Sequence, residues 1–236
     1  MQIKSRKDIV FILLAGFFIT NAIVGELIGG KLIQIGPFIM SIGIIPWPIV
    51  FLSTDLINEY YGKQGVKRLT MLTAVLIAYA FILLFAALNV GASDNSPVSD
   101  SAFFTVFGQS LWIIIGSITA FIASQMIDVF VFWMLRKRTG KKHIWLRATG
   151  STAVSQLIDS FIVTGIAFYL PGKLSLADFI NTAITGYTCK LIIAVLLTPM
   201  IYVGHNLINI YIGHDEADKA IDDSAHESIN KEEENS

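Results

Sequence analysis

The sequence predicts an all-α membrane protein with six transmembrane helices. The first reason is composition: of 236 residues, 54% are hydrophobic and only 15% are charged, and the mean hydropathy is +0.65. Soluble domains carry about 25% charged residues. The second reason is a series of apolar runs near the roughly 20 residues that a helix needs to cross a bilayer. The third is the way in which basic residues alternate between the connecting loops.

Six runs are long and apolar enough to span. They lie at about residues 8–25, 38–58, 69–88, 103–135, 148–170 and 179–202, with apolar residues continuing to 212. The second run contains Pro46 and Pro48, which interrupt helical hydrogen bonding. Broken helices are tolerated in membranes where protein or a cavity satisfies the freed backbone groups. The fourth run exceeds the bilayer thickness, so its helix is tilted or begins outside.

Basic residues predict the orientation. With six spans, fourteen Lys and Arg residues fall in the N-terminus, the second and fourth loops and the C-terminal tail, all on one side. Only Lys31 and Lys173 fall in loops on the other side. Because cytoplasmic loops are enriched in Lys and Arg, both termini are expected in the cytoplasm. The chain is expected to cross the membrane several times.

The C-terminal segment differs from the rest. Residues 214–236 contain nine acids and two bases and almost no large apolar residues, a composition typical of disorder. We therefore expect a six-helix transmembrane domain over 1–213 and a disordered acidic cytoplasmic tail over 214–236. The histidines and the lone Cys189 lack metal-ligand spacing, so no metal site or cofactor is predicted. No phosphate-binding glycine loop occurs, so the chain is not expected to hydrolyse ATP itself.

One short polar phrase, Ser-Gln-x-Ile-Asp, occurs twice, on neighbouring predicted helices. Its polar members are Ser124, Gln125 and Asp128 in the first copy and Ser155, Gln156 and Asp159 in the second. Residues three and four apart share a helical face, so each helix carries one polar cluster. Carboxylates at membrane depth are costly and mark functional sites. The two clusters therefore predict the two sides of one polar ligand site.

Lys190 lies about twelve residues into the last predicted helix, near mid-membrane at 1.5 Å per residue. Such a lysine needs a carboxylate or a water-filled cavity, and Asp159 is its expected partner. A purely structural ion pair is the alternative. Buried pairs stabilise poorly compared with apolar packing, which favours a functional role.

The end of the second run carries Asp55, Asn58 and Glu59. One interpretation is a functional site near the cytoplasmic surface. The other is ordinary interfacial ion pairing with the bases at Lys63, Lys67 and Arg68. Glu26, at the outer end of the first run, has the same two interpretations.

These motifs carry a family resemblance. The stretch Ser53 to Gly62, which includes Asp-Leu-Ile-Asn-Glu-Tyr-Tyr-Gly, together with the repeated phrase and Lys190, resembles the bacterial vitamin-uptake-type family of queuosine precursor transporters. The resemblance covers about residues 9–212. It implies a six-helix inner-membrane importer of a 7-deazaguanine base, the cyano or aminomethyl precursor of the tRNA nucleoside queuosine. It also implies kinship in shape with the substrate-binding subunits of energy-coupling-factor vitamin transporters.

The polar clusters suit such a flat, purine-like base. A carboxylate accepts two hydrogen bonds from an amino-pyrimidine edge, and a glutamine side chain both donates and accepts. The residues expected at the base are Gln125, Asp128, Gln156 and Asp159, with Ser124 and Ser155 beside them and Lys190 balancing the carboxylates. Asn58 and Glu59 are expected at an inner gate.

Two other functions compete with import. The runner-up is a substrate-binding subunit that depends on a separate ATPase module. An intramembrane aspartyl enzyme would need a Gly-x-Gly-Asp pattern, which the sequence lacks, so no enzyme is predicted. The expected partners are the bilayer and a small purine-like molecule, not nucleic acid. For the energy source, proton coupling, facilitated diffusion and an external ATPase are all compatible with the sequence. For the oligomeric state, the sequence allows close helix contacts within one chain or between chains.

Overall fold

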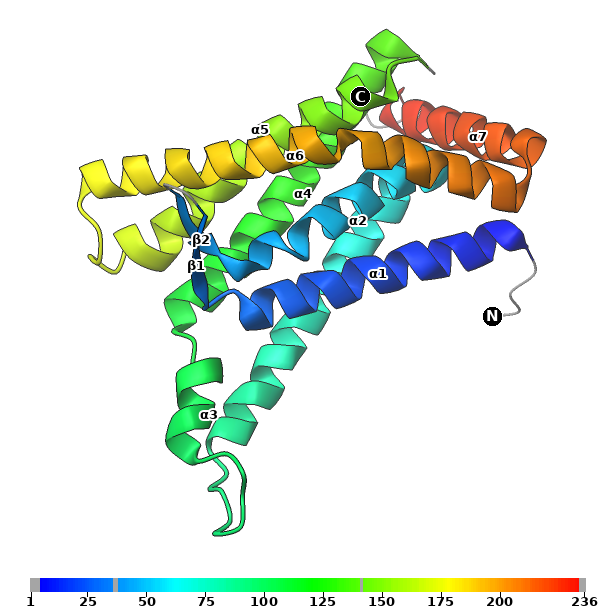
Figure 1. Ribbon diagram of the computed structural model, residues 1–236. Helices are drawn as coiled ribbons and strands as arrows, with labels where there is room; N and C mark the ends of the chain where they lie inside the picture. Colours follow the sequence, from blue (N-terminus) through cyan, green and yellow to red (C-terminus); the bar gives the residue numbers. More distant parts are fainter. Residues whose placement is uncertain (1–4, 36–37, 141, 234–236) are drawn as a thin grey trace.

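The computed structural model describes residues 5–35, 38–140 and 142–233, and long helices dominate it (Figure 1). The elements in order are α1 (Arg6–Ile28), β1 (Leu32–Ile35), β2 (Phe38–Ser41), η1 (Ile42–Ile44), α2 (Trp47–Leu88), α3 (Asp100–Phe107), α4 (Leu111–Thr139), α5 (Ile144–Thr164), η2 (Gly165–Tyr169), α6 (Leu176–Ile212) and α7 (His214–Glu233). Among the described residues, five helical stretches are long and apolar enough to cross a membrane: Arg6–Ile28, Ile42–Leu88, Asp100–Thr139, Ile144–Tyr169 and Leu176–Ile212. The chain is therefore an all-α, multi-pass membrane protein.

The sequence-based prediction of where the second helix starts is wrong. Phe38–Ser41 forms the strand β2, which pairs antiparallel with β1, so that Leu32 lies opposite Ser41. Helix α2 begins only at Trp47, with a proline in its first turn. Proline lacks a backbone N–H and fits only the first turn of a helix. The prolines therefore mark a helix start, where the sequence interpretation took them for a break inside a longer helix.

The second and third predicted spans form one element, α2, of 42 residues, which is kinked at Gly62, where the dihedral angles are non-helical, φ 74° and ψ 178°. Glycine reaches this conformation because it lacks a Cβ atom. Before the bend, α2 follows α1 for nearly its whole length. Gly25 lies against Trp47 near the end of α1, and the Tyr61 hydroxyl donates to the Lys7 carbonyl, 2.7 Å away, near its start. After Gly62 the helix turns away and runs to Leu88 (Figure 1).

The fourth and fifth predicted helices are each divided. The fourth consists of α3 and α4, and Ser110 caps α4 by accepting a hydrogen bond from the Ile113 backbone at 3.4 Å. The fifth ends in the π-helical segment η2, closed by the Leu170 N–H bonded to the Gly165 carbonyl at 2.9 Å. Such π segments often occur at functional sites. The sixth helix, α6, extends to Ile212, as the apolar pattern indicates.

Two apolar clusters hold the bundle together. The first joins α1, both halves of α2 and α4, with Phe18, Ile57, Ile77 and Phe132 fully buried. The second joins α2 to the start of α5, the end of α6 and α7, and Tyr60 is buried within it. The helix ends that meet in this second cluster are those that the sequence predicts to face the cytoplasm.

The C-terminal segment differs from the expectation of a disordered tail. Residues 214–233 form helix α7, which lies beside α2 and α6 (Figure 1). One face of α7 is buried, through Ala217, Ala220, Ile221 and Ser224. These residues recur at intervals of three and four, the spacing of one helical face. The acidic residues between them dominate the composition of the segment, so composition alone does not reveal this apolar face.

Candidate functional site

A cavity of about 820 Å³ lies among α1, η1, α2, α4, α5 and α6. Ligand sites in proteins commonly measure about 300–1,000 Å³ and are mostly apolar with a few polar groups. Aromatic side chains supply much of the apolar wall: Trp47 and Phe51 from α2, Phe121 from α4 and Phe168 from η2. Trp47 lies near both Phe51 and Phe121, with ring centroids 6.2 and 5.9 Å apart. The cavity therefore has flat apolar surfaces on which a ring can stack.

An ion pair crosses one wall of this cavity. Lys190, on α6, donates a hydrogen bond to the carboxylate of Asp159, on α5, and both residues line the cavity. The predicted pairing of these two residues is confirmed. Lys190 remains 32% exposed and Asp159 18% exposed, because the cavity reaches them. The pair thus presents two charged groups to the cavity, and their opposite charges sum to zero.

Three buried polar atoms on the cavity wall have no hydrogen-bond partner among the described residues. They are the Asp55 Oδ1, the Gln156 Nε2 and the Ser160 Oγ. Buried polar groups are nearly always hydrogen-bonded, and an unpaired one costs about 1–3 kcal/mol. Their side chains are 5%, 1% and 2% exposed. The three residues line the cavity although these atoms are themselves buried, so a ligand with complementary groups pairs with them once their side chains rotate.

Glu26 adds a third carboxylate to the wall. It lies near the end of α1 at 7% exposure and accepts a hydrogen bond from the Ser117 hydroxyl on α4. Its backbone carbonyl accepts a second hydrogen bond, from Gln109 Nε2 at 2.9 Å. Glu26 also interacts electrostatically with Asp159 and Lys190. These contacts tie α1 and α4 together at the end of the cavity that the topology predicts to be extracellular.

The first copy of the repeated phrase lies mostly behind the cavity wall. Ser124 lines the cavity, whereas Gln125 and Asp128 are buried between helices. Gln125 Oε1 accepts a hydrogen bond from the Thr54 hydroxyl at 3.3 Å. Asp128 Oδ1 accepts one from the Ser155 hydroxyl at 3.1 Å.

The second copy is turned toward the cavity. Gln156 and Asp159 line it, whereas Ser155 binds Asp128 behind the wall. The structure thus brings Ser124, Gln156, Asp159 and Lys190 together in one cavity. The two copies meet each other through Ser155 and Asp128 as neighbouring helices, but they are not two equal sides of the cavity.

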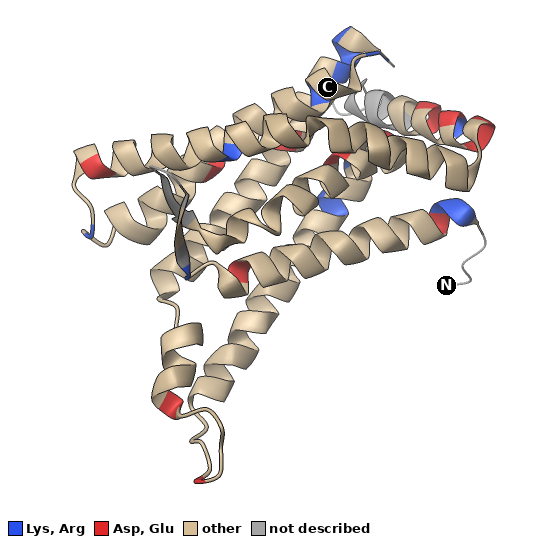
Figure 2. Cartoon of the chain, in the orientation of Figure 1, with Lys and Arg blue, Asp and Glu red and all other residues tan. Residues whose placement is uncertain are grey.

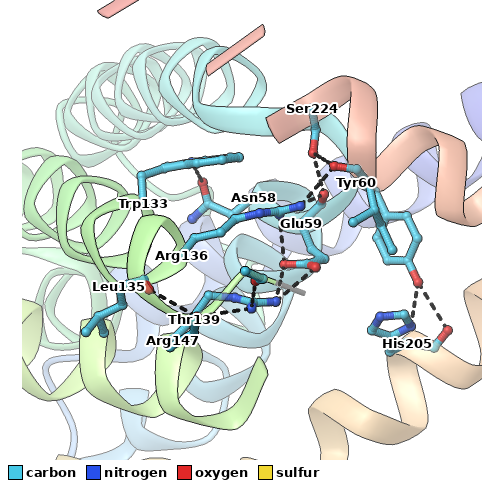
Figure 3. A network of polar contacts seen from close by, with 12 residues as sticks. Asn58, Glu59, Tyr60, Trp133, Leu135, Arg136, Thr139, Arg147, His205 and Ser224 are labelled. Atoms are coloured by element: carbon cyan, nitrogen blue, oxygen red, sulfur yellow. Dashed lines mark hydrogen bonds and ion pairs between the residues drawn. The ribbon is translucent and has the colours of Figure 1, made fainter. Parts of the chain in front are cut away.

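Glu59 lies away from the cavity wall, in a charged cluster that Figure 3 shows. Its carboxylate accepts hydrogen bonds from Arg136 on α4, at 3.0 Å, and from Arg147 on α5, at 2.9 and 3.0 Å. The sequence interpretation considered Lys63, Lys67 and Arg68 as candidate partners and did not anticipate these two arginines. The cluster joins α2, α4 and α5 through one carboxylate that is only 2% exposed.

Helix α7 covers this cluster. The Ile221 carbonyl accepts a hydrogen bond from Arg136 at 2.9 Å, and the Ser224 hydroxyl donates to the Glu59 carbonyl at 2.7 Å. Beside the cluster, Asn58 accepts a hydrogen bond from Trp133 Nε1 at 3.3 Å (Figure 3). Asn58 and Glu59 are thus placed together, in a closed layer of protein behind the cavity.

The residues that sequence reasoning missed or left open are Asp55, Ser160, Glu26 and the aromatic groups of the wall. Asp55 and Glu26 carried a signal, because each is a carboxylate within an apolar run. Their exposure to the cavity depends on how helices pack, which the sequence pattern does not show. The aromatic residues carried no distinguishing signal, since sixteen phenylalanines are spread over the chain.

Comparison with known proteins identifies the family. A family model described as a putative vitamin uptake transporter matches residues 41–204. A relative from Bacillus subtilis, named probable queuosine precursor transporter, is 32% identical over 182 residues, which cover 75% of this chain and 77% of the relative. A protein of the same name from Haemophilus influenzae is 26% identical over 159 residues, which cover 66% of this chain and 63% of that relative. No solved structure matches the chain. The chain belongs to the putative vitamin uptake transporter family, as its sequence motifs indicate.

Proposed function

We propose that this protein imports a 7-deazaguanine precursor of queuosine across the bacterial inner membrane, through the cavity described above. The family and the names of two relatives support transport of a queuosine precursor. The observation that carries the proposal for this chain is the set of unpartnered atoms on the cavity wall: Asp55 Oδ1, Gln156 Nε2 and Ser160 Oγ. They offer hydrogen bonds that a guanine-like edge can complete.

The chemistry of that edge fits the wall. A 7-deazaguanine presents a ring N–H and an exocyclic amine as donors, and a ring carbonyl as acceptor. Asp55 accepts from the donors, while the Gln156 amide donates to the carbonyl. A buried site that pairs such groups rejects analogues that lack them, because its own polar atoms then stay unpaired. Phe51 or Phe121 supplies a face on which the ring can stack.

The remaining polar residues of the cavity have supporting roles in this proposal. Asp159 and Lys190 set the charge of the wall, and they suit either a cyano or an aminomethyl substituent. Ser124 borders the same space. Because Gln125, Asp128 and Ser155 lie behind the wall, we do not place them in contact with the base. Asn58 and Glu59 belong instead to the layer that closes the cytoplasmic end.

We propose six crossings, with both termini in the cytoplasm. Arg6, at the start of α1, donates to the Tyr211 carbonyl near the end of α6 at 3.1 Å. The two ends of the transmembrane domain are therefore adjacent, which an even number of crossings requires. The bend at Gly62 supplies the extra crossing by dividing α2 into two spans. Figure 2 supports the orientation: Lys and Arg gather at the N-terminal end of α1 and at the α4–α5 connection, whereas the α3 end shows acids only.

In this orientation the Glu59 cluster with Arg136 and Arg147 acts as the inner gate. It closes α2, α4 and α5 together on the cytoplasmic side of the cavity. Release of the base to the cytoplasm requires these helices to separate. The relatives' names describe transporters, so we propose that the chain carries its substrate itself rather than serving as a binding subunit for a separate ATPase.

Uptake tests the proposal. A host that cannot make queuosine is given this chain and fed cyano- or aminomethyl-7-deazaguanine at nanomolar concentration, and queuosine in its tRNA is measured. The wild-type chain is expected to restore the modification, and Asp159→Ala to lose it at equal amounts in the membrane. Asp94→Asn, on the exposed α2–α3 loop, is the matched control and is expected to behave as wild type. Absence of modification with the wild-type protein present in the membrane would refute import of these bases.

A further inference from the structure

Two buried carboxylates beside the cavity have no cation bonded to them in the described residues. Asp55, on α2, is 5% exposed, and Asp128, on α4, is 2% exposed. The Asp55 Oδ1 and the Asp128 Oδ2 have no hydrogen-bond partner there. An ionised carboxylate at membrane depth is costly unless it is paired. Both residues therefore require either a counter-charge or a proton.

The two carboxylates lie at the same level of the bundle. One residue before Asp55, Thr54 bonds to Gln125 of α4 at 3.3 Å, and three residues after it, Asn58 accepts from Trp133 of α4 at 3.3 Å. Asp128 falls between these two contacts on α4, and it interacts electrostatically with Asp55. Asp55 faces the cavity, whereas Asp128 lies behind the wall. The two form a path leading inward from the cavity, which we call the Asp55–Asp128 pair.

The charges around the pair balance only one of its two carboxylates. On the cytoplasmic side, Glu59 is bonded to two arginines, Arg136 and Arg147, and Asp222 of α7 also acts electrostatically on Arg136. Arg147 and Glu59 both act electrostatically on Asp55. Arg147 therefore favours one negative charge on the pair. A second negative charge has no match, and a bound proton removes it.

Groups on the other helices around the pair do not change this balance. From α5, the Ser155 hydroxyl donates to Asp128 and the nearby Ser151 hydroxyl donates to the Ala148 carbonyl; both are neutral. Across the cavity, Asp159 and Lys190 neutralise each other. Glu26 from α1 is negative when ionised and supplies no cation, and the charged groups that act on it are Asp159 and Lys190.

We propose that the Asp55–Asp128 pair binds one proton on the extracellular side and releases it to the cytoplasm in each cycle, so that the protein is a proton-coupled symporter. This inference rests on the proposed transport function. The proton enters through the cavity at Asp55 and is shared with Asp128 while the base is bound. When the inner gate opens, water reaches the pair and the proton leaves, so each base that enters is accompanied by one proton.

Reconstitution separates coupling from transport. The purified full-length chain is placed in lipid vesicles, and two properties are measured. The first is exchange of labelled for unlabelled aminomethyl- or cyano-7-deazaguanine without any gradient. The second is net accumulation driven by a pH gradient, acid outside, with a pH-sensitive dye trapped in the lumen. The wild-type protein is expected to show both, with acidification of the lumen that begins when the base is added.

The variant Asp128→Asn distinguishes the two properties. It keeps the shape of a protonated aspartate but cannot release a proton, so exchange is expected to persist while gradient-driven accumulation and lumen acidification are lost. Asp94→Asn is the matched control and is expected to retain all three. Accumulation by Asp128→Asn equal to that of the wild type would overturn the proposal.

The wild-type protein alone provides an independent test, which holds even if Asp128→Asn does not fold. Exchange without any base-dependent acidification would overturn proton coupling while leaving transport intact. Accumulation that follows a sodium gradient at constant pH would also overturn it, in favour of a metal cation. If the wild-type protein exchanges neither base, the proposed function fails, together with the inference that rests on it.

Discussion

Glu59 illustrates at the scale of one residue how this chain joins its helices at the end proposed to face the cytoplasm. Its carboxylate is buried, and its bonds to Arg136 and Arg147 reach two further helices. Removing one member of a buried ion pair leaves the other charge without a partner, at a cost of about 3–5 kcal/mol. The cluster is thus strong only while all three members are present.

Substitution tests this view of Glu59. We expect Glu59→Gln to lower the free energy of unfolding by about 3–5 kcal/mol, because two buried arginines lose their carboxylate. The measurement is thermal unfolding of the purified protein in detergent. Glu216→Gln, on the exposed face of α7, is the control and should leave the transition temperature unchanged. A transition temperature for Glu59→Gln equal to that of the wild type would show that the cluster contributes little to stability.

At the scale of elements, the bend in α2 depends on one glycine. Gly62 has φ 74° and ψ 178°, a conformation that is nearly restricted to glycine and costs other residues about 1–3 kcal/mol. We expect Gly62→Ala to destabilise the protein by that amount in the same unfolding assay. Gly16→Ala, within α1 where an added Cβ has open space, should be neutral or slightly stabilising. Equal behaviour of the two variants would argue against the bend.

Helix α7 is the second element whose role can be tested. It buries Ile221 and supplies two hydrogen bonds, through the Ile221 carbonyl and the Ser224 hydroxyl, to the Glu59 cluster. Hydrogen bonds to charged groups contribute about 1.5–3 kcal/mol, and neutral ones about 0.5–1.5 kcal/mol. Truncation after Gly213 is therefore expected to lower the transition temperature. A truncated protein as stable as the full chain would favour the disordered tail that composition predicts.

At the scale of the whole molecule, the sequence predicts features that depend on the bilayer and on nearby residues alone, such as apolar helices and the need of a buried charge for a partner. Length and apolar content identify the chain as an all-α membrane protein, although the second and third predicted spans form the single element α2. The Asp159–Lys190 pair follows because a lysine at membrane depth requires a partner. Features that depend on how distant helices pack were missed. Arg136 and Arg147 sit in a loop-like basic stretch of the sequence, and only the bundle brings them to Glu59.

The repeated phrase shows the same limit within one motif. Its two copies share residue types, yet Gln156 and Asp159 face the cavity while Gln125 and Asp128 are buried behind it. Spacing along a helix indicates which residues share a face, but the neighbours of that face are set by rotation and tilt in the bundle.

The proposed topology can be tested on the intact cell. Single cysteines are introduced at Ser93, in the α2–α3 loop, and at Lys142, before α5, in a chain with Cys189→Ala. An impermeant maleimide added outside is expected to label Ser93→Cys but to label Lys142→Cys only after the membrane is permeabilised. Equal labelling of both positions from outside would contradict six crossings with cytoplasmic termini.

The most direct test of the central claim is equilibrium binding to the purified protein. Labelled aminomethyl- or cyano-7-deazaguanine is titrated, and unlabelled competitors with a guanine-type or an adenine-type edge are compared. We expect saturable binding that only the guanine-type edge displaces, and a loss of about 1–3 kcal/mol in affinity for Gln156→Ala, because a buried hydrogen bond is removed. Gln64→Ala, near the bend of α2 and away from the cavity wall, should bind as the wild type does. Absent binding, equal competition by both edges, or an unchanged affinity for Gln156→Ala would contradict recognition of the base in this cavity.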